Sequence, residues 1–405
     1  MKYLYIILGY LADQILPIAG LFHRGARSWI NGRKSQTYPE NLNHPIWIHC
    51  ASLGEFEQGR PLIEAIKTEW PEQHIILTFF SSSGYNIRKN YELADWVGYM
   101  PMDTLPKAKS FVNKTRPKMA LFVKYEFWYC HMAALIEQDI PYFFISSVWT
   151  DSHYLLKWYY RWLLKQVFNA RVIFVQDQAS KQKLTWLGYL HVIVAGDTRI
   201  DRVVAIARNN LKIEEFENLD TKKPILVAGS TWPADDQLLL QFLELVDTHS
   251  LIIVPHEPIE SEINRLLKAF DRYQPVRYST WIQNDFKVMI LDKIGMLNKL
   301  YAYAEVAYIG GGFGKGIHNT LEAAVYGIPV FFGPHYKQFN EAKSMITIGI
   351  AFCVEDAQTL ALKWENIIPG KLQDIKNQSG RYFSENAGAT ATIIDYLRPL
   401  IQQPK

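Results

Sequence analysis

"YIGGGFGKGIHNTLEAAVYGIPVFFGP", residues 308–334, holds in one stretch the succession of elements that predicts the fold. An apolar strand ends at Ile309, a glycine-rich turn follows over 310–316, and Asn319 is suited to cap a helix that includes residues 321–325. Another apolar run begins at residue 328. A strand, a turn, a helix and a second buried strand make a βαβ unit, the building block of parallel sheets.

Short apolar runs of the same kind recur along the chain, with helical segments between them. They are continuous rather than alternating, which is typical of strands buried on both faces of a parallel sheet. The expected strands are 45–51, 74–80, 119–125, 141–148, 171–177, 224–230, 250–256, 287–292, 305–311 and 328–334. With right-handed crossovers, these runs predict an α/β fold with two doubly wound sheets.

The rhythm of strands pauses over 199–224, which is polar, charged and free of strand patterns. Such a stretch is typical of an interdomain connection. The sequence therefore predicts five parts: an apolar and basic segment 1–34, a Rossmann-like domain 35–205, a linker 206–223, a second Rossmann-like domain 224–380, and a C-terminal helix 381–405 placed to pack back on the first domain. We expect the two domains to face one another across a cleft, at the carboxyl ends of their strands.

The composition indicates a globular protein, because 49% of the 405 residues are hydrophobic and 20% are charged. A formal charge of +3 and the absence of long Lys/Arg runs exclude nucleic acid as the expected partner. The three cysteines are far apart and lack metal-ligand spacing, which indicates a reducing compartment and no structural zinc.

The N-terminus is the one strongly apolar segment. Residues 3–22 are mostly apolar but are interrupted by Asp13, Gln14 and Pro17, and basic residues follow at Arg24, Arg27, Arg33 and Lys34. This pattern favours an interfacial helix or a short anchor held to anionic lipid on the cytoplasmic side of a membrane. An ordinary core helix is the alternative.

The glycine-rich turn predicts an anion site. Glycine lets the backbone approach a ligand, and N–H groups at the start of the following helix favour a phosphate. The residues concerned are Gly311, Gly312, Gly314, Lys315, Gly316, His318, Asn319 and Thr320. A dinucleotide fingerprint fits poorly, because the acid Glu322 follows inside the next helix rather than about 20 residues on. Glu322 is suited to ribose hydroxyls, or is a first-turn carboxylate stabilised by the helix dipole.

Two more strand ends are expected at the same edge. Ser230 and Thr231 follow a strand and are suited to bind phosphate, or to cap the next helix. "VPHEP" supplies His256 after another strand. Asn340 and Glu341 are placed to close over a sugar or its nucleotide, whereas His335 and Lys337 are equally suited to a solvated loop.

"IHCASLGEFEQGRP", residues 48–61, begins as a buried strand and passes through a sharp turn to a carboxylate at Glu55. A carboxylate at the mouth of a cleft can act as a general base. The first turn of a helix also favours a glutamate, because it stabilises the helix dipole. The residues alone leave these two roles open, with Glu57 as a nearby competitor.

Several short motifs in a fixed order resemble the bacterial 3-deoxy-D-manno-octulosonic acid (Kdo) transferase family of lipopolysaccharide synthesis. They are "ASLGE" at 51–55, "PMD" at 101–103, "EFW" at 126–128, "GD" at 196–197, "AGSTWP", "VPHEP", the stretch from Leu300 to Pro334, and "FNEA". The chain departs from the usual pattern at Lys124, Tyr129, His256–Glu257 and Gly316–Asn319.

The resemblance implies a GT-B fold and an inverting transfer of Kdo from CMP-Kdo to a lipid A precursor, with Glu55 as the base. It implies neither a cofactor nor a metal, and a membrane surface as partner. Residues suited to the acceptor are Ser52, Gly54, Ser82, Ser83, Lys124 and Glu126. The alternatives are another GT-B enzyme, such as a UDP-sugar transferase or epimerase, and a non-catalytic nucleotide-sugar binding protein.

Overall fold

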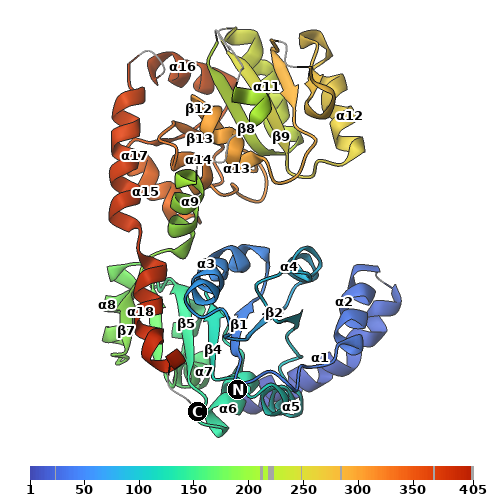
Figure 1. The fold of residues 1–405 in the computed structure, drawn as a ribbon, viewed down its shortest axis with the longest axis vertical. Helices are drawn as coiled ribbons and strands as arrows, with labels where there is room; N and C mark the ends of the chain where they lie inside the picture. Colours follow the sequence, from blue (N-terminus) through green and yellow to red (C-terminus); the bar gives the residue numbers. More distant parts are fainter. Residues whose placement is uncertain are drawn as a thin grey trace. The chain divides into compact units, whose positions relative to one another are not determined.

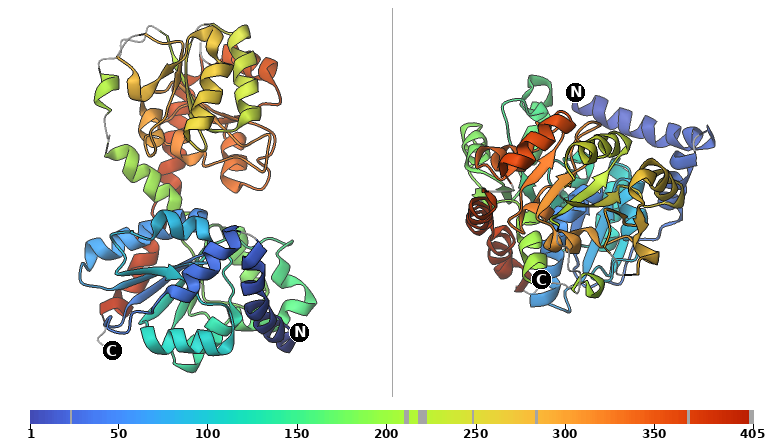
Figure 2. Two further views of the ribbon diagram at one scale, coloured as in Figure 1. Left: turned by 90° about the vertical axis from the view of Figure 1, so that its right-hand side faces the viewer. Right: turned by 90° about the horizontal axis from the view of Figure 1, so that it is seen from above.

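The structure is a computed structural model that describes residues 1–22, 24–209, 213–217, 223–247, 249–282, 285–367 and 370–402. The chain forms two compact units, one made of residues 1–201 and 387–405 and the other of residues 202–386. Each unit is a twisted parallel sheet with helices on both faces (Figures 1 and 2). Two parallel-sheet α/β domains are therefore confirmed.

The first unit has a seven-stranded sheet in the order β3-β2-β1-β4-β5-β6-β7. Its strands are β1 Ile46–Cys50, β2 Ile75–Phe79, β3 Trp96–Tyr99, β4 Met119–Val123, β5 Tyr142–Ser147, β6 Val172–Val175 and β7 Val192–Val194. The helices around it are α3 Leu53–Glu69, α4 Ser82–Arg88, α5 Leu105–Thr115, α6 Tyr129–Glu137, α7 Arg161–Val167, α8 Gln178–Trp186 and α18 Ala389–Gln402. The strands β2 and β3 lie on one side of β1, and the strands from β4 onward lie on its other side, so the strand order reverses between β1 and β4.

The second unit also has a seven-stranded sheet, in the order β10-β11-β9-β8-β12-β13-β14, and it differs from the first because its fourth strand, β11, lies between β9 and β10. Its strands are β8 Ile225–Thr231, β9 Ser250–Pro255, β10 Val276–Arg277, β11 Val288–Ile290, β12 Val306–Ile309, β13 Val330–Phe332 and β14 Ala351–Cys353. Its helices are α10 Glu214–Glu217, α11 Pro233–Leu245, α12 Glu260–Ala269, α13 Leu297–Leu300, α14 Leu321–Ala324, α15 Asn340–Thr347, α16 Ala357–Ile367 and α17 Leu372–Asn386. Here the reversal lies between β8 and β12.

The central strands explain the continuous apolar runs of the sequence. All five residues of β1 are buried, and successive side chains enter different cores. Trp47 packs with Phe111 and Phe122 on one face, whereas Ile46 and Ile48 pack on the other. A strand covered by helices on both faces has no polar side, so its sequence shows no alternation.

All ten expected strands are present. The structure adds β3, β7, β10 and β14, which are the four edge strands of the two sheets. The helix expected to include residues 321–325 is α14, which is a single turn and ends at Ala324.

The units divide elsewhere than the expected linker 206–223. Helix α9, Thr198–Arg208, runs through the division at 201/202, and residues 210–212 and 218–222 lie outside the described part. The second division, at 386/387, falls between α17 and α18, so only the later part of the segment 381–405 belongs to the first unit. The Asp201 carboxylate accepts hydrogen bonds from the backbone N–H groups of Gly388 and Thr390, at 2.5 and 2.6 Å, and so fixes the start of α18.

Helix α18 completes the core of the first unit. Ile393 and Leu397 are fully buried in the cluster that also holds Ile48 and Leu62, and α18 packs against α3. Arg398 donates to the Glu69 carboxylate at 2.6 Å at the far end of α3. The last helix is therefore a structural part of a unit formed mainly by the first half of the chain.

The N-terminal segment forms α1, Lys2–Phe22, and α2, Arg24–Ser35. One face of α1 packs on the first unit: the Tyr5 hydroxyl donates to buried Asp103 at 2.6 Å, and Asp13 pairs with Lys107 at 2.6 Å. Among the described side chains of α1, most of the exposed ones are apolar, and they are Tyr3, Leu4, Ile7, Leu8, Tyr10, Leu11 and Ile15. None of the helices in the described residues combines the length and apolar character needed to cross a bilayer.

Candidate functional site

The predicted site residues of the first unit gather at one edge of its sheet. After β1 come Ser52 and, in the first turn of α3, Glu55; after β2 come Ser82 and Ser83 at the start of α4; and the turn after β4 carries Lys124 and Glu126. Strands β2, β1 and β4 are neighbours and run parallel, so these turns lie side by side. This edge is the topological switch point, where doubly wound sheets bind ligands.

Glu55 lies in the first turn of α3, for which Ser52 is the N-cap residue. The Ser52 hydroxyl does not cap the helix; instead it donates to Oε2 of Glu55. Oε1 of Glu55 has no hydrogen-bond partner among the described residues, and the side chain is only partly buried. The competitor Glu57 is engaged by Arg88 at 3.3 Å. The carboxylate that remains available for a proton at this turn is therefore Glu55.

Glu126 is held by a chain of buried polar groups. The indole N–H of Trp128 donates to Oε2 of Glu126 at 2.7 Å, and Nε2 of fully buried His49 lies 3.4 Å from the same oxygen. Nδ1 of His49 contacts the Thr78 hydroxyl at 2.9 Å, and Trp47 donates to that hydroxyl at 2.8 Å. The His49 ring is therefore fixed through Nδ1, whereas its Nε2 atom makes no hydrogen bond and only lies near Glu126.

Strained backbone occurs at the strand ends of both units. Lys124 has φ +61° directly after β4, and Ser230 has φ +55° near the end of β8, where the pairing with β9 shifts register. Residues other than glycine adopt this region at a cost of about 1–3 kcal/mol, and they persist where the surroundings fix them. The side chains of Lys124 and Ser230 are only partly buried, so both can reach a ligand.

In the second unit, the glycine-rich turn follows β12 and lies beside the end of β8. Asp235, in the first turn of α11, fixes the glycine-rich turn in place. Its carboxylate accepts hydrogen bonds from the backbone N–H groups of Gly311 and Trp232, both at 2.9 Å, and from the Tyr308 hydroxyl at 2.8 Å. Burial raises the pKa of Asp235, and these three donors oppose that shift.

Three of the glycines are required by packing inside the protein. A Cβ at Gly310 would lie 2.3 Å from the carbonyl oxygen of Ser230, one at Gly311 would lie 2.4 Å from that of Gly316, and one at Gly312 would lie 2.4 Å from the nitrogen of Gly333. Gly314 differs, because its Cβ would meet only the Gly311 oxygen at 3.7 Å and the residue is exposed.

The expected cradle of free N–H groups is smaller than predicted. The N–H of Gly311 is bound by Asp235, those of Gly314 and Gly316 donate to the Gly311 carbonyl at 3.0 and 3.2 Å, and that of His318 donates to the Gly310 carbonyl. A tight turn satisfies its own polar groups, which a sequence pattern does not show. Gly314 and Lys315 remain the exposed part of the turn.

Three rings stack beside the turn. The imidazole of His256 lies 4.7 Å from the Trp232 ring and 4.4 Å from that of His318, and Trp232 Nε1 donates to His318 Nε2 at 3.0 Å. Burial lowers the pKa of His318 to about 4, and it lowers the pKa of His256 as well. His318 is therefore neutral at pH 7 and offers an N–H donor at Nδ1 rather than a positive charge.

Asn319 and Glu322 form one local arrangement. The Asn319 side chain accepts from the Leu321 N–H at 3.2 Å and donates to Glu322 at 2.9 Å, although the N-cap residue of the short helix α14 is Thr320 rather than Asn319. Burial raises the pKa of Glu322, whereas Asn319 and the charge of Arg202 lower it. Asn340 and Glu341 occupy the first turn of α15, after β13.

A cavity of about 690 Å³ adjoins the exposed part of the glycine-rich turn. Lys315 and Lys337 both line it, together with His335, whose Nδ1 lies 2.6 Å from the Gly314 carbonyl oxygen. His335 and Lys337, for which the sequence left a ligand contact and a solvated loop equally open, both line the cavity. Two cations next to an open glycine suit a phosphate-bearing ligand.

Two hydroxyls that were predicted to bind the donor, those of Thr231 and Thr320, are buried. Thr231 is only 1% exposed, so its hydroxyl lies below the surface, and Ser230 is the hydroxyl of that pair that reaches solvent. Thr320 is likewise 1% exposed. Side chains at the end of a parallel strand alternate between the core and the surface, so a pair of neighbours seldom shares one role.

Several residues of the two edges were given no role in the site by the sequence analysis, although Trp128 and Trp232 lie in the quoted motifs "EFW" and "AGSTWP". They are His49, Thr78 and Trp128 around Glu126, and Trp232 and Asp235 around the glycine-rich turn. A histidine inside the apolar strand 45–51 was a usable signal, because a buried polar side chain requires a partner. Asp103 of the "PMD" motif has a structural role, since it accepts from the N–H groups of Cys130 and His131 at the start of α6.

Comparisons with known proteins agree with this geometry. Residues 25–202 match a family model described as 3-Deoxy-D-manno-octulosonic-acid transferase (kdotransferase). A bifunctional glycosyltransferase/methyltransferase of Fusobacterium nucleatum is 26% identical over 376 residues, which cover 89% of this chain but only 58% of that protein. A 3-deoxy-D-manno-octulosonic acid transferase of Haemophilus influenzae is 25% identical over 380 residues, which cover 88% of this chain and 87% of that one.

Among solved structures, a UDP-GlcNAc 2-epimerase from Neisseria meningitidis matches with a TM-score of 0.61 at 14% identity, covering 88% of this chain and 100% of that chain. At that identity the likeness shows the fold alone, which is of the GT-B type. The family match over residues 25–202 and the relatives named 3-deoxy-D-manno-octulosonic acid transferase, which are 24–26% identical over most of the chain, make the chain similar to the Kdo transferases and support a glycosyltransferase.

Proposed function

We propose that this protein is a Kdo transferase that transfers Kdo from CMP-Kdo to a lipid A precursor, with inversion, in lipopolysaccharide synthesis. One observation carries the proposal: Glu55 ends the first βα turn at the switch point of its sheet and keeps one carboxylate oxygen without a described partner. A general base needs such an accessible lone pair.

The reaction is a single displacement. Glu55 takes the proton of an acceptor hydroxyl, whose oxygen forms a bond to the anomeric carbon of Kdo. The bond from that carbon to the phosphate oxygen breaks, its electron pair stays on the phosphate, and CMP leaves. One displacement inverts the anomeric centre and needs no covalent intermediate, so one catalytic carboxylate suffices.

The developing charge on the phosphate is met by Lys315 and Lys337 at the cavity beside the glycine-rich turn, and by the Ser230 hydroxyl. We propose that neither a metal nor a cofactor takes part. The acidic pair Asp235–Asp236 is engaged elsewhere, because Asp235 binds three donors and Asp236 pairs with Arg265. Glu322 and Asn340 would bind the sugar hydroxyls.

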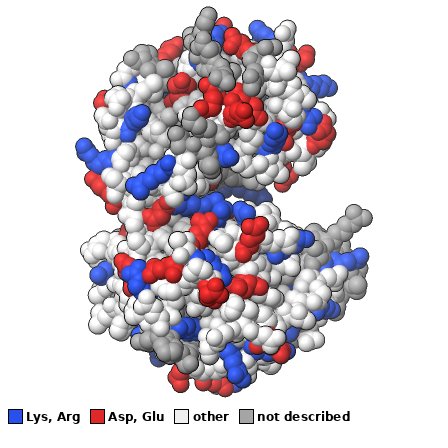
Figure 3. All heavy atoms as spheres, viewed as in Figure 1, with Lys and Arg blue, Asp and Glu red and all other residues white. Residues whose placement is uncertain are grey.

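The acceptor carries sugar hydroxyls and phosphates, for which the first unit offers Lys124, Ser82 and Ser83 at neighbouring turns. On the face of the molecule drawn in Figure 3, acidic and basic side chains are interspersed over each unit. Such mixing favours a local phosphate contact over a broad positive surface for nucleic acid.

We further propose that the protein lies on the cytoplasmic face of the inner membrane. Support comes from the apolar residues that α1 exposes, Leu8 and Leu11 among them. Deleting α1 would also remove Tyr5 from the core, so surface substitutions are the better test. Leu8→Glu with Leu11→Glu should release the protein from anionic liposomes while transfer to a detergent-dispersed acceptor continues; retained sedimentation with liposomes would count against the proposal.

The function itself is tested by a product mass spectrum. Purified protein with CMP-Kdo and a tetra-acylated lipid A precursor should yield the acceptor plus the mass of Kdo. The alternative, another nucleotide-sugar enzyme of the same fold, predicts turnover with a UDP-hexose and none with CMP-Kdo. A protein that binds CMP but converts neither donor would be a non-catalytic binding protein.

A further inference from the structure

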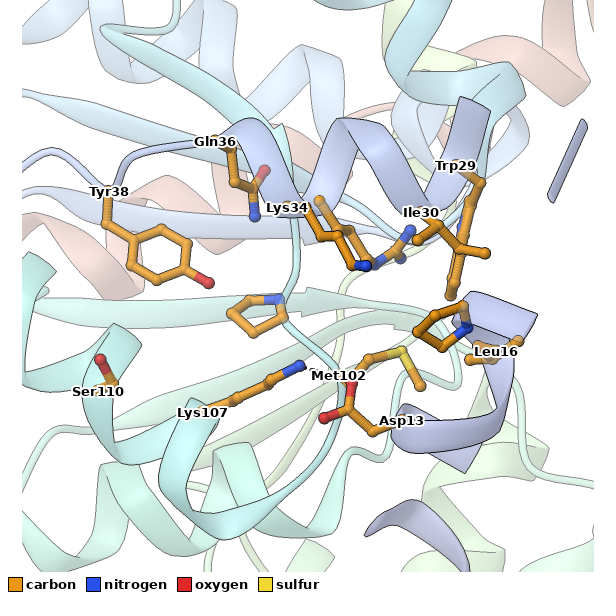
Figure 4. Close-up of a pocket in the computed structure, with 13 residues that line it drawn as sticks. Asp13, Leu16, Trp29, Ile30, Lys34, Gln36, Tyr38, Met102, Lys107 and Ser110 are labelled. Atoms are coloured by element: carbon orange, nitrogen blue, oxygen red, sulfur yellow. Dashed lines mark hydrogen bonds and ion pairs between the residues drawn. The ribbon is translucent and has the colours of Figure 1, made fainter. Parts of the chain in front are cut away.

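A second cavity, of about 360 Å³, lies within the first unit and is separate from Glu55. The two N-terminal helices form one side of it, and the segment from β3 to α5 forms the other (Figure 4). Its volume is within the range of small-ligand sites in proteins. Neither the proposed donor nor the proposed acceptor contacts account for it.

The wall of the cavity is apolar on one side. Leu16 and Pro17 of α1, Trp29 and Ile30 of α2, and Met102 of the segment after β3 line it. Figure 4 shows Leu16, Trp29, Ile30 and Met102 grouped at one end. Such a wall suits hydrocarbon.

The rest of the cavity is cationic. Arg33, Lys34 and Lys107 line it against a single carboxylate, Asp13, which pairs with Lys107. Lys34 has no hydrogen bond or ion pair in the part of the chain that the structure describes, and it faces the cavity across from Lys107 in Figure 4. Two positive charges therefore remain without a negative partner.

Arg33 is an unusual member of this wall. Its guanidinium lies 3.5 Å from the Trp29 ring and 4.5 Å from the Tyr99 ring, and it donates to the Phe80 carbonyl at 2.7 Å. No carboxylate pairs with it among the described residues, and its Nε and Nη1 atoms have no hydrogen-bond partner. Burial lowers the pKa of Arg33 to about 9, so the group keeps its charge at neutral pH. A mostly buried cation without a counter-ion favours an anionic ligand nearby.

We propose that this cavity binds one anionic phospholipid, with the phosphate between Lys34 and Lys107 and the start of an acyl chain against Leu16, Ile30 and Met102. The bilayer is the source of the lipid, because the helix that supplies Leu16 also exposes Leu8, Leu11 and Ile15. The size of the cavity admits the headgroup and the first carbons, while the rest of the chains stay in the leaflet.

This inference goes beyond the proposed function and does not depend on it, because lipid binding requires neither a donor nor Glu55. It also differs from general adhesion to a membrane surface. Adhesion follows total exposed apolar area and charge, whereas a site is saturable and is lost when its volume is filled.

The test uses the full chain and short-chain phosphatidylglycerol below its micelle concentration, followed by native mass spectrometry and titration calorimetry. We expect one phosphatidylglycerol per chain, and weaker binding of the matching phosphatidylcholine. Lys34→Gln should weaken phosphatidylglycerol binding about tenfold, through loss of one charge-assisted contact. Ser110→Trp, which fills the cavity from an exposed position without changing its charge, should weaken it as strongly.

Lys109→Gln is the matched control, because Lys109 lies on α5 beside Ser110 but pairs with Glu137 outside the cavity. Phosphatidylglycerol binding by this variant should be unchanged. Leu11→Glu should lose vesicle binding yet keep the short-chain lipid. The proposal is overturned if Lys34→Gln and Ser110→Trp both bind phosphatidylglycerol as the unchanged chain does. It is also overturned if inorganic phosphate alone binds as tightly, or if a phosphorylated glucosamine lipid binds there and phosphatidylglycerol does not.

Discussion

Both units reverse their strand order beside their first strand, at β1/β4 and at β8/β12, yet they place different chemistry there. In the first unit the turns after β1 and β4 carry side chains, Glu55 and Glu126, held by neighbouring polar groups. In the second unit the turn after β12 is built from backbone alone over Gly310 to Gly312, because the surrounding atoms leave no room for a Cβ there. The fold determines where a ligand binds, and the residues of each turn determine what can be done to it.

The two units also differ in the hydrogen bonding of a buried histidine. In the first unit, Nδ1 of His131 lies 2.7 Å from Asp103. In the second unit, His249 is fully buried between Phe242 and Trp364, and neither of its ring nitrogens has a hydrogen-bond partner. The comparison predicts that the units respond differently to substitution and to acid.

The largest expected effect is that of Glu55→Gln in the first unit. Loss of the base should lower kcat by about 10²–10⁴-fold, the usual contribution of general base catalysis. CMP affinity, measured by calorimetry, should stay the same, because the donor contacts are proposed for the second unit. Glu57→Gln is the control and should retain most activity, since Arg88 engages Glu57. Equal turnover by Glu55→Gln and the unchanged chain would remove Glu55 from the mechanism.

In the second unit, Gly312→Ala should destabilise the protein by about 1–3 kcal/mol, because the added Cβ would meet the Gly333 backbone at 2.4 Å and the turn must shift. Gly314→Ala meets no atom closer than 3.7 Å and should leave the thermal midpoint unchanged. If the exposed part of the turn contacts the donor, Gly314→Ala still weakens CMP binding. Equal stability of the two variants would show that the turn is less tightly packed than described.

Acid should destabilise the second unit through His249. Burial lowers the pKa of His249 to about 3, so below the unfolded value of about 6.5 only the unfolded chain takes up the proton. Stability from this group is complete above pH 6.5 and is lost as the pH falls towards 3, by about 2 kcal/mol between pH 7 and pH 5. Urea unfolding of His249→Phe at both pH values should show a smaller loss than the unchanged chain; an identical loss would exclude His249 as its source.

The smallest effect is expected for Tyr5→Phe. The substitution removes the hydrogen bond from α1 to buried Asp103, and it should cost about 1 kcal/mol, because Asp103 keeps its donors from Cys130 and His131. Denaturant unfolding measures this loss, and proteolysis near α1 should become faster. Tyr10→Phe, at an exposed position of the same helix, should have no effect.

The sequence predicted the ten inner strands because each is buried on both faces and so appears as a continuous apolar run. It did not predict the edge strands β3, β7, β10 and β14, which are two to four residues long. An edge strand has a neighbour on one side only, so it needs neither length nor unbroken apolarity. Its pairing is visible only once the neighbouring strand is in place.

By itself, the sequence determined the two-sheet fold, the resemblance to the Kdo transferases and the turns that carry the candidate site, since these follow from local runs and motifs. Tertiary structure decided which groups remain available. It showed that the N–H groups of Gly311, Gly314 and Gly316, which were expected to be free, donate to Asp235 or to the Gly311 carbonyl. It also showed that Thr231 is buried and that Arg88 engages Glu57. A motif names a residue, but whether its polar atoms are free depends on partners far away in the sequence.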